Sequence, residues 1–446
     1  MLNRTIIFIL CWLFPIFGQA ETLLELYRLA HRNDPVLQKS SFEFYRVAEA
    51  KNEVKGALLP QLNATAQYGS NRYVDHGGTI ATQQNSFSQN RTWSIGLQLS
   101  QSIFNKSQWL KLSAQEKATV QAQLSHLNAE QNLRYRLASV YINTLKNQEK
   151  LNIVKAEKKA LENNLNVIKQ RVNVGALSVT DLHEAQAQYD RIVAEEILAV
   201  NEVNNDREAL FEIINSYPKS LLKLDGNKLK LCAVNPFNTY YETVRKKNLT
   251  LMYHQVSVEL AKENIAIAQA DHLPTINLTG SLNRNNSRRP ADYLAYGTTD
   301  RTLDRVFIGI EMHIPIYSGG QIHSRTKQQQ FSYQSAQAEL ESAQREIKKN
   351  LNMVVNSLTA IKSSIKAYEQ SVISADSAYH AVNAEYEIGR KTTVDLLNSL
   401  RVKYQSQSDL SNARYDYLLL KLQLDLLMGE LNDDKLRELS GLLILN

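Results

Sequence analysis

Two long stretches of the chain contain neither glycine nor proline, one between Gly96 and Gly175 and one between Gly320 and Gly389. Each can therefore form one uninterrupted helix of about 70 residues, which at ~1.5 Å per residue is roughly 100 Å long. In the second stretch, apolar residues recur at alternating steps of three and four from Leu351 to Tyr386. This spacing is typical of coiled-coil packing. The sequence therefore predicts long helices that pack against other helices.

Both stretches end in similar turn motifs, at residues 172–184 and 386–399. In each motif an aspartate stands six residues after a glycine: Asp181 after Gly175, and Asp395 after Gly389. Glycine can take the left-handed conformation that ends a helix, and the segments 178–181 and 392–395 both fit the Ser/Thr-x-x-acid capping box that begins one. We therefore predict two helical hairpins, with their tips near 175 and 389.

The apolar period changes from 3.6 to 2 in four segments, and a polar loop separates the two segments of each pair. In the first segment Leu62, Ala64 and Ala66 alternate with Asn63 and Thr65. Such alternation predicts strands with one apolar and one polar face. A soluble antiparallel sandwich is the alternative reading of these strands. The predicted strands are residues 61–70, 92–104, 274–284 and 304–317.

The order of helix, strand, loop, strand and long helical hairpin occurs twice, which predicts an internal two-fold repeat. Arg4, an apolar run from Ile6 to Phe17 and small residues before position 21 indicate a secretory signal peptide. No later stretch is long and apolar enough for a membrane-spanning helix. The predicted parts are a signal peptide (1–20), a first repeat (21–215), an equatorial joint (216–237), a second repeat (238–430) and a C-terminal tail (431–446).

Composition excludes several classes of function. The net charge of +6 is spread along the chain, whereas a nucleic-acid-binding protein gathers its basic residues in one stripe. Removal of the signal peptide leaves only Cys232, so no disulfide framework exists and the role of this thiol is open. The nine histidines are scattered without the spacing of a zinc site, and no catalytic arrangement stands out. We therefore predict no enzyme, no metal and no cofactor.

The four strands also predict an assembly. Four strands cannot close a barrel, and open edges in lipid leave backbone groups unpaired at a cost of several kcal/mol each. Tyr73 and Trp93 near one end, with Phe104 and Tyr317 near the other, stand where aromatic girdles belong. An oligomeric transmembrane barrel satisfies both requirements.

Several motifs in this order resemble the TolC family of outer membrane efflux proteins, and the likeness covers nearly all of the mature chain. They are the two tip motifs, the strands that begin after Pro60 and Pro274, the early Asn-Asp-Pro at 33–35, and Asn-Ala-Arg-Tyr-Asp-Tyr at 412–417. The resemblance implies a mixed membrane protein: a homotrimer whose twelve strands, four per chain, form one barrel in outer membrane lipid, continued by a long α-helical coiled-coil barrel across the periplasm.

The resemblance also implies a function and partners. The chain would be the exit duct of a tripartite efflux or type I secretion system in a Gram-negative cell, with a periplasmic adaptor protein and an inner-membrane transporter as partners. The alternatives are an exporter dedicated to one secreted protein and a structural outer-membrane coiled-coil adhesin. The sequence identifies neither the substrate nor the pump.

In a trimer, every tip residue occurs three times around one axis, so Asp181 and Asp395 would place up to six carboxylates near the narrow end. By resemblance, Asp395 matches one member of the family's constricting acidic ring. The second member is Asn398 here, which halves the expected charge. Taken alone, each aspartate is simply a helix cap, and the two roles are compatible.

The family's closed state is held by links between the tip hairpins. The matching positions are Tyr386 and Lys391 on the second hairpin, facing Thr180 and Asp181 on the first. The alternative is that Tyr386 is a coiled-coil seam residue and Lys391 a solvated charge. The family has a further link between an amide and an acid. The matching positions here are Asn164 and Asn383, so the acid of this link is missing. The alternative is that both asparagines belong to a solvated helix face.

Overall fold

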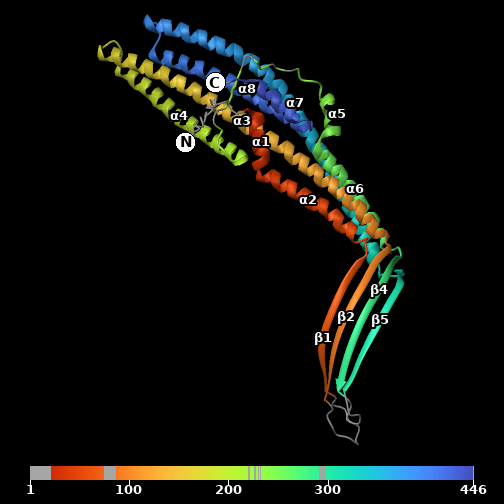
Figure 1. Cartoon of the computed structure of the whole chain (residues 1–446). Coiled ribbons are helices and arrows are strands. Elements are labelled where there is room, and N and C mark those ends of the chain that lie inside the picture. Colours follow the sequence, from red (N-terminus) through yellow and green to blue (C-terminus); the bar gives the residue numbers. More distant parts are fainter. Residues whose placement is uncertain are drawn as a thin grey trace, which may run out of the picture. The chain divides into compact units, whose positions relative to one another are not determined.

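The computed structural model describes residues 22–74, 87–218, 221–225, 228–229, 231, 233–290 and 298–444. The predicted signal peptide and Cys232 lie outside these ranges. The elements, labelled in Figure 1, are α1 (Leu23–Asn33), α2 (Pro35–Gly56), β1 (Gln61–Val74), β2 (Phe87–Phe104), α3 (Lys106–Asn173), α4 (Val179–Ile214), β3 (Lys223–Leu224), α5 (Phe237–Lys247), α6 (Leu249–Ala270), β4 (Thr275–Pro290), β5 (Thr298–His313), α7 (Gln321–Glu387), α8 (Thr393–Leu427), α9 (Asp433–Gly441) and β6 (Leu443–Ile444).

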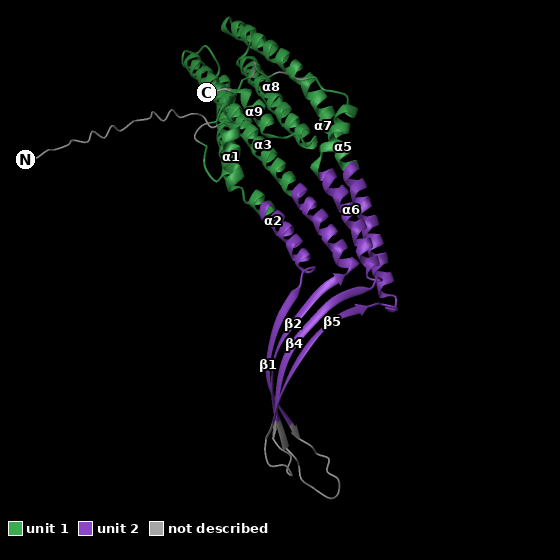
Figure 2. Cartoon of the chain, turned by 45° about the vertical axis from the view of Figure 1, so that its right-hand side comes forward, with its two compact units in different colours: residues 1–40, 126–249, 345–446 green, residues 41–125, 250–344 purple. Residues whose placement is uncertain are grey.

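The chain divides into two compact units, coloured separately in Figure 2. Unit 1 comprises residues 1–40, 126–249 and 345–446, and unit 2 comprises residues 41–125 and 250–344. Unit 1 is helical apart from the short β3–β6 pair, whereas unit 2 contains the four long strands and the helical segments next to them.

The four strands of unit 2 form one antiparallel sheet in the order β1-β2-β4-β5 (Figure 1). The register places like residues together: Leu62 lies opposite Leu99, Tyr68 opposite Trp93, and Leu282 opposite Val306. Because side chains alternate between the two faces of a strand, the apolar residues of all four strands share one face. The other face is mainly Asn, Thr, Gln, Ser and Gly.

The strands extend further than their predicted ranges. β1 continues to Val74, β2 begins at Phe87, β4 continues to Pro290 and β5 begins at Thr298. The prediction followed apolar alternation, which stops where both faces become polar, while the ladder of backbone hydrogen bonds continues. At its other end β5 stops at His313, so Tyr317 lies beyond the sheet. Tyr68 is the aromatic residue opposite Trp93, and the side chain of Tyr73 lies outside the described part.

Polar side chains join neighbouring helices of unit 2 in the same order as the strands. Lys51 of α2 pairs with Glu116 of α3 at 3.0 Å, and Lys117 of α3 pairs with Glu263 of α6 at 2.7 Å. Arg325 of α7 reaches Asp271, just after α6, at 2.9 Å. The helical layer of this unit therefore has α2 and α7 at its edges, as the sheet has β1 and β5.

Corresponding helices of the two chain halves have nearly equal lengths. α1 and α5 both have 11 residues, and α2 and α6 both have 22. The hairpin helices have 68 and 67 residues in α3 and α7, and 36 and 35 in α4 and α8.

Two helices, α5 and α6, cover residues 237–270, and a break at Asn248 separates them. Asn248 has an extended backbone (ψ 117°) between α5 and α6, and its side-chain nitrogen donates to the Leu427 carbonyl at 2.9 Å. Asp34 occupies the same place between α1 and α2, where its carboxylate accepts from the Leu37 backbone N–H at 2.7 Å and pairs with Arg136. The sequence marks the break at Asp34, because Pro35 follows it. No proline follows Asn248, so the sequence does not mark the break between α5 and α6.

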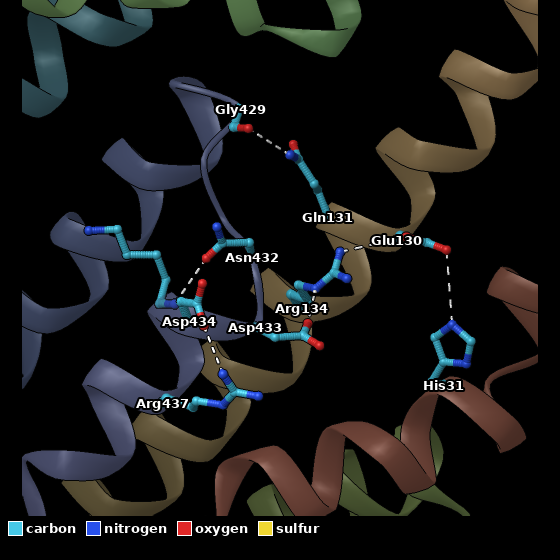
Figure 3. A network of polar contacts seen from close by, with 10 residues as sticks. His31, Glu130, Gln131, Arg134, Gly429, Asn432, Asp433, Asp434 and Arg437 are labelled. Atoms are coloured by element: carbon cyan, nitrogen blue, oxygen red, sulfur yellow. Dashed lines mark hydrogen bonds and ion pairs between the residues drawn. The ribbon is translucent and has the colours of Figure 1, made fainter.

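The C-terminal tail folds onto unit 1 (Figure 3). Asn432 caps α9, Arg134 of α3 pairs with Asp433 at 3.0 Å, and Gln131 donates to the Gly429 carbonyl at 2.9 Å. β6 then pairs with β3 of the joint. These contacts join segments about 200 to 300 residues apart in sequence, beyond the reach of local patterns.

Within the described ranges, none of the helices combines the length and apolar composition needed to cross a bilayer.

Candidate functional site

The turn between α3 and α4 is built by its own residues. Gly175 has a φ of +75°, its N–H donates to the Val172 carbonyl at 2.9 Å, and the next N–H donates to the Arg171 carbonyl at 2.8 Å. These two bonds form a Schellman helix end. Ser178 then begins α4 in a capping box, in which its hydroxyl accepts from the Asp181 N–H at 3.2 Å and donates to the Asp181 carboxylate at 2.7 Å.

The turn between α7 and α8 repeats this geometry. Gly389 also has a φ of +75°, and the same two carbonyl bonds end α7. The Thr392 hydroxyl accepts from the Asp395 N–H at 3.2 Å and donates to its carboxylate at 2.9 Å. Both aspartates are therefore held in one rotamer by their own turns.

Both caps favour the charged form of the aspartate. The hydrogen bond from the Ser178 hydroxyl is the main cause that lowers the pKa of Asp181. Thr393 of α8 also lowers this pKa, although its buried hydroxyl does not reach hydrogen-bond geometry with any described group. The Thr392 backbone N–H and hydroxyl lower the pKa of Asp395, with a smaller contribution from Lys391. At neutral pH the two tips thus carry fixed negative charges.

Asp395 and Asn398 lie three residues apart and share one face of α8. The buried residues of this turn, Thr393, Leu396, Leu397 and Leu400, lie on the opposite face. Asn398 is exposed and Asp395 is half-buried. Asp181 instead lies on the flank of the packed face of α4, beside the start of α8. The structure therefore leaves the Asp395–Asn398 face uncovered within the single chain.

The predicted locking residues are placed differently from one another. Tyr386 is only 7% exposed, with Arg171 of α3 stacked at 5.2 Å from its ring centre and no hydrogen-bond partner for its buried hydroxyl in the described part. Lys391 and Thr180 are exposed. Among described residues, neither Tyr386 nor Lys391 has a hydrogen bond or ion pair with Thr180 or Asp181.

The two asparagines of the further link are half-buried rather than fully solvated. The side-chain nitrogen of Asn164 is buried and finds no hydrogen-bond partner among the described groups, and nothing places it in contact with Asn383.

A cluster of apolar side chains supports both tips. It joins α3, α4 and α8, and partly buried tyrosines from α4, α7 and α8 pack against it. Its buried members are Val154, Leu161, Leu165, Ile168, Ala185, Ile192, Leu397 and Leu400.

Comparisons with known proteins now decide the family. The model of the family described as "Outer membrane efflux protein" matches residues 26–216 and 240–430, which is most of the chain. This chain belongs to the outer membrane efflux protein family. The resemblance inferred from the tip motifs is thereby confirmed.

Relatives of this efflux family member span its whole length. The outer membrane protein TolC of Vibrio cholerae serotype O1 is 35% identical over 423 residues, which cover 95% of this chain and 94% of that protein. The proteases secretion protein PrtF of Dickeya chrysanthemi is 26% identical over 437 residues, which cover 95% and 91%. The crystal structure of the outer membrane protein VceC from Vibrio cholerae has the same fold, with a TM-score of 0.74, 17% identity and coverage of 91% and 96%.

Sequence reasoning missed three residues of this family member: Arg171 and Thr393 at the tips, and Glu157, which lies 16 residues before the end of α3. Arg171 gave no signal because an arginine near a helix end usually serves the helix dipole. Thr393 follows the cap residue and looks like an ordinary first-turn position. Glu157 lies inside α3, where nothing in the local pattern predicts burial of a carboxylate.

Glu157 is a buried carboxyl among charged neighbours from α4 and α8. Its carboxylate lies 3.4 Å from Arg191, which also reaches Glu195 at 3.2 Å. Burial raises the pKa of Glu157 to about 7, against the opposing effects of Arg191 and Arg401. This group therefore changes charge near neutral pH.

Proposed function

We propose that this family member is the trimeric outer membrane exit duct of an efflux or type I secretion system, in which each chain contributes four strands to one twelve-stranded barrel. The single observation that carries the proposal is the sheet of unit 2, with one predominantly apolar face and two unpaired edges. Support for the internal repeat comes from the matched helix lengths of the two halves.

The apolar face of the sheet fits lipid rather than a protein core. Leu62, Val306 and Ile308 are 68%, 77% and 76% exposed in the single chain. On β2 the face runs from Trp93 to Phe104, with Gln101 as its one polar residue and a register shift after Ser102. This stretch is roughly 36 Å along the strand and about 25 Å in height at a tilt of ~45°, which is the height of the apolar band of outer-membrane barrels. A soluble sandwich needs a second layer over this face, and no described element packs on it.

The end of the apolar face runs diagonally across the sheet. The first polar residues of that face are Ser70 and Arg91 on β1 and β2, whereas Arg284 and Asp304 take this place on β4 and β5. Arg91 lies opposite Arg288, which is four residues after Arg284. The apolar residues of β4 and β5 therefore end four residues before the level at which those of β1 and β2 end. Strands that tilt through a bilayer produce such a diagonal.

Three copies are favoured over two by the need for a passage. β1 and β5 present unpaired backbone groups along 14 and 16 residues, and closure with further copies satisfies them. Two copies give eight strands, whose interior is filled by side chains, whereas twelve strands leave an open lumen. The polar face of the sheet would line that lumen.

The proposal makes the two tips of unit 1 the closed gate. In a trimer the uncovered face with Asp395 and Asn398 supplies a ring of three carboxylates and three amides, and Asp181 adds three carboxylates at its flank. The single chain forms no link of Tyr386 or Lys391 with Thr180 or Asp181, so we propose that this lock forms in the assembled ring. Exposed ion pairs of this kind contribute about 0–1 kcal/mol each, which a docking partner can overcome.

An inner-membrane transporter and a periplasmic adaptor are the partners that such a duct requires. A second candidate function is an exporter dedicated to one secreted protein. The relative named for protease secretion supports it. The sheet and the tips would serve both functions, the export of small solutes and the export of one secreted protein.

Light scattering of the mature protein in detergent tests the assembly, with membrane fractionation alongside. We expect a mass of three chains and recovery with the outer membrane. A monomer in detergent, or recovery in the soluble fraction, would refute the proposal.

A further inference from the structure

Two arginines lie side by side on the face of the sheet that carries the apolar residues. Arg91 is the first polar residue of this face on β2, and Arg288 lies two outward positions beyond Arg284, the first polar residue on β4. Arg91 of β2 lies directly opposite Arg288 of β4 in the register, and both are exposed. Within the described ranges, neither guanidinium has a hydrogen bond or ion pair. We call Arg91 and Arg288 the arginine pair.

Directly opposed like charges destabilise a sheet, because the β-carbons of cross-strand neighbours are only about 4.5–5.5 Å apart. On its other side Arg288 lies opposite Asp300 of β5, whereas the register partners of Arg91 are Ser70 and Arg288. The charge of Arg91 therefore has no acidic cross-strand neighbour, and a bound anion would offset its repulsion with Arg288.

The other charged groups of this face are already engaged. Arg284 donates two hydrogen bonds to Asp304, at 2.7 and 2.8 Å, and Asn286 donates to Asp300 at 2.6 Å. At the described outward positions beyond the apolar residues, four arginines stand against two aspartates, a net charge of +2 per chain. The arginines are Arg72, Arg91, Arg284 and Arg288, and the aspartates are Asp300 and Asp304.

The position of the arginine pair favours a lipid over a free anion. Trp93 follows Arg91 on the same face, opposite Tyr68 and Asn286, and the apolar residues begin directly beyond it. Amphipathic rings of this kind lie at headgroup level in a bilayer. An anion bound here thus lies where a lipid carries its phosphate, with its acyl chains against the apolar face.

We propose that the arginine pair binds the phosphate group of a lipid in the surrounding membrane, one lipid per chain. Two adjacent guanidiniums can each donate a bidentate pair of hydrogen bonds to one phosphate, and its negative charge cancels their repulsion. The proposal rests on the proposed function, since it requires this face to point toward lipid.

The test uses purified trimers in detergent and native mass spectrometry. The probes are dioleoyl phosphatidic acid, which carries a phosphate, and dioleoylglycerol, which has the same acyl chains and none. The test variant is Arg91→Ser with Arg288→Ser. The matched control is Arg301→Ser, because Arg301 is also exposed and lies opposite Ser287 at nearly the same height, on the polar face.

We expect wild type and the Arg301→Ser control to retain phosphatidic acid in preference to dioleoylglycerol. Loss of both guanidiniums should reduce the retention of phosphatidic acid about tenfold or more. Equal retention by the double variant, equal retention of the two lipids, or displacement of the lipid by excess inorganic phosphate would overturn the proposal.

A second variant gives a readout of opposite sign. Arg91→Glu places a carboxylate opposite Arg288, with Ser70 on its other side, so it should raise the melting temperature in lipid-free detergent while it abolishes the further rise on addition of phosphatidic acid. A lower melting temperature in lipid-free detergent would contradict the repulsion argument. If all variants remain trimeric channels but bind both lipids alike, this inference fails and the proposed function stands. If wild type forms no trimer, the proposed function itself fails.

Discussion

Replacement of Glu157 by glutamine should flatten the pH dependence of stability. Burial holds the pKa of Glu157 at about 7, above its usual value of 4.5. Between these values the folded chain binds a proton that the unfolded chain has released. The stabilising contribution is therefore present below about pH 4.5 and is lost as pH rises to about 7.

The size of the effect follows from this interval. At ~1.4 kcal/mol per pH unit the upper limit is about 3 kcal/mol, and solvent that screens the exposed charges around this buried carboxyl reduces it to about 1–2 kcal/mol. Arg191 and Arg401 oppose the shift, while Glu195 and the burial itself favour it. Tyr404 also faces this group, from α8.

The assay is helix melting in detergent, followed by circular dichroism at pH 5 and pH 7.5. From pH 5 to pH 7.5 the melting temperature of wild type should fall by roughly 2–4 °C more than that of Glu157→Gln. Burial also raises the pKa of Asp206 and Asp425. Their contribution to the pH dependence of the melting temperature is the same in wild type and in Glu157→Gln. The control Glu162→Gln removes an exposed glutamate from the same helix and should melt as wild type does. An unchanged slope in Glu157→Gln would refute the reasoning.

Three further changes test the tips, each by melting temperature. Thr392→Ala removes a capping hydroxyl and should cost about 1 kcal/mol, and no loss would show that the cap carries no stability. Gly389→Ala forces a φ of +75° on alanine and should cost roughly 1–2 kcal/mol, whereas the control Gly56→Ala has open space without that φ and should be neutral. Tyr386→Phe deletes a buried hydroxyl that has no partner in the described part of the single chain; because the proposed lock gives it one in the assembled ring, the variant should lose about 1 kcal/mol, and a gain in stability would show that the hydroxyl stays unpaired in the trimer.

The parts of the fold that depend on local sequence could be predicted. Gly175 and Gly389 end their helices through bonds within a few residues, and Ser178 and Thr392 cap the next helices through their own third residues. Strand alternation reflects a single period along each strand. Such signals require no knowledge of distant residues.

The parts that depend on distant contacts could not be predicted. Asn248 breaks a helix by bonding to Leu427, and α9 is held by Arg134, which is about 300 residues away. At the candidate site, the sequence placed Asp395 and Asn398 on one helix face but could not show that Arg171 covers Tyr386. The proposed links between tips would involve several chains, so they leave no signature within one.

Single-channel conductance in a planar bilayer tests the central claim most directly, with wild type, Asp395→Ala and a control, Asp409→Ala, on the same helix away from the tip. We predict a low wild-type conductance that rises in Asp395→Ala and is unchanged in Asp409→Ala, because the proposed ring of Asp395 narrows the passage at the tips. The absence of any channel would contradict the duct, and equal conductance in all three proteins would contradict a gate at Asp395.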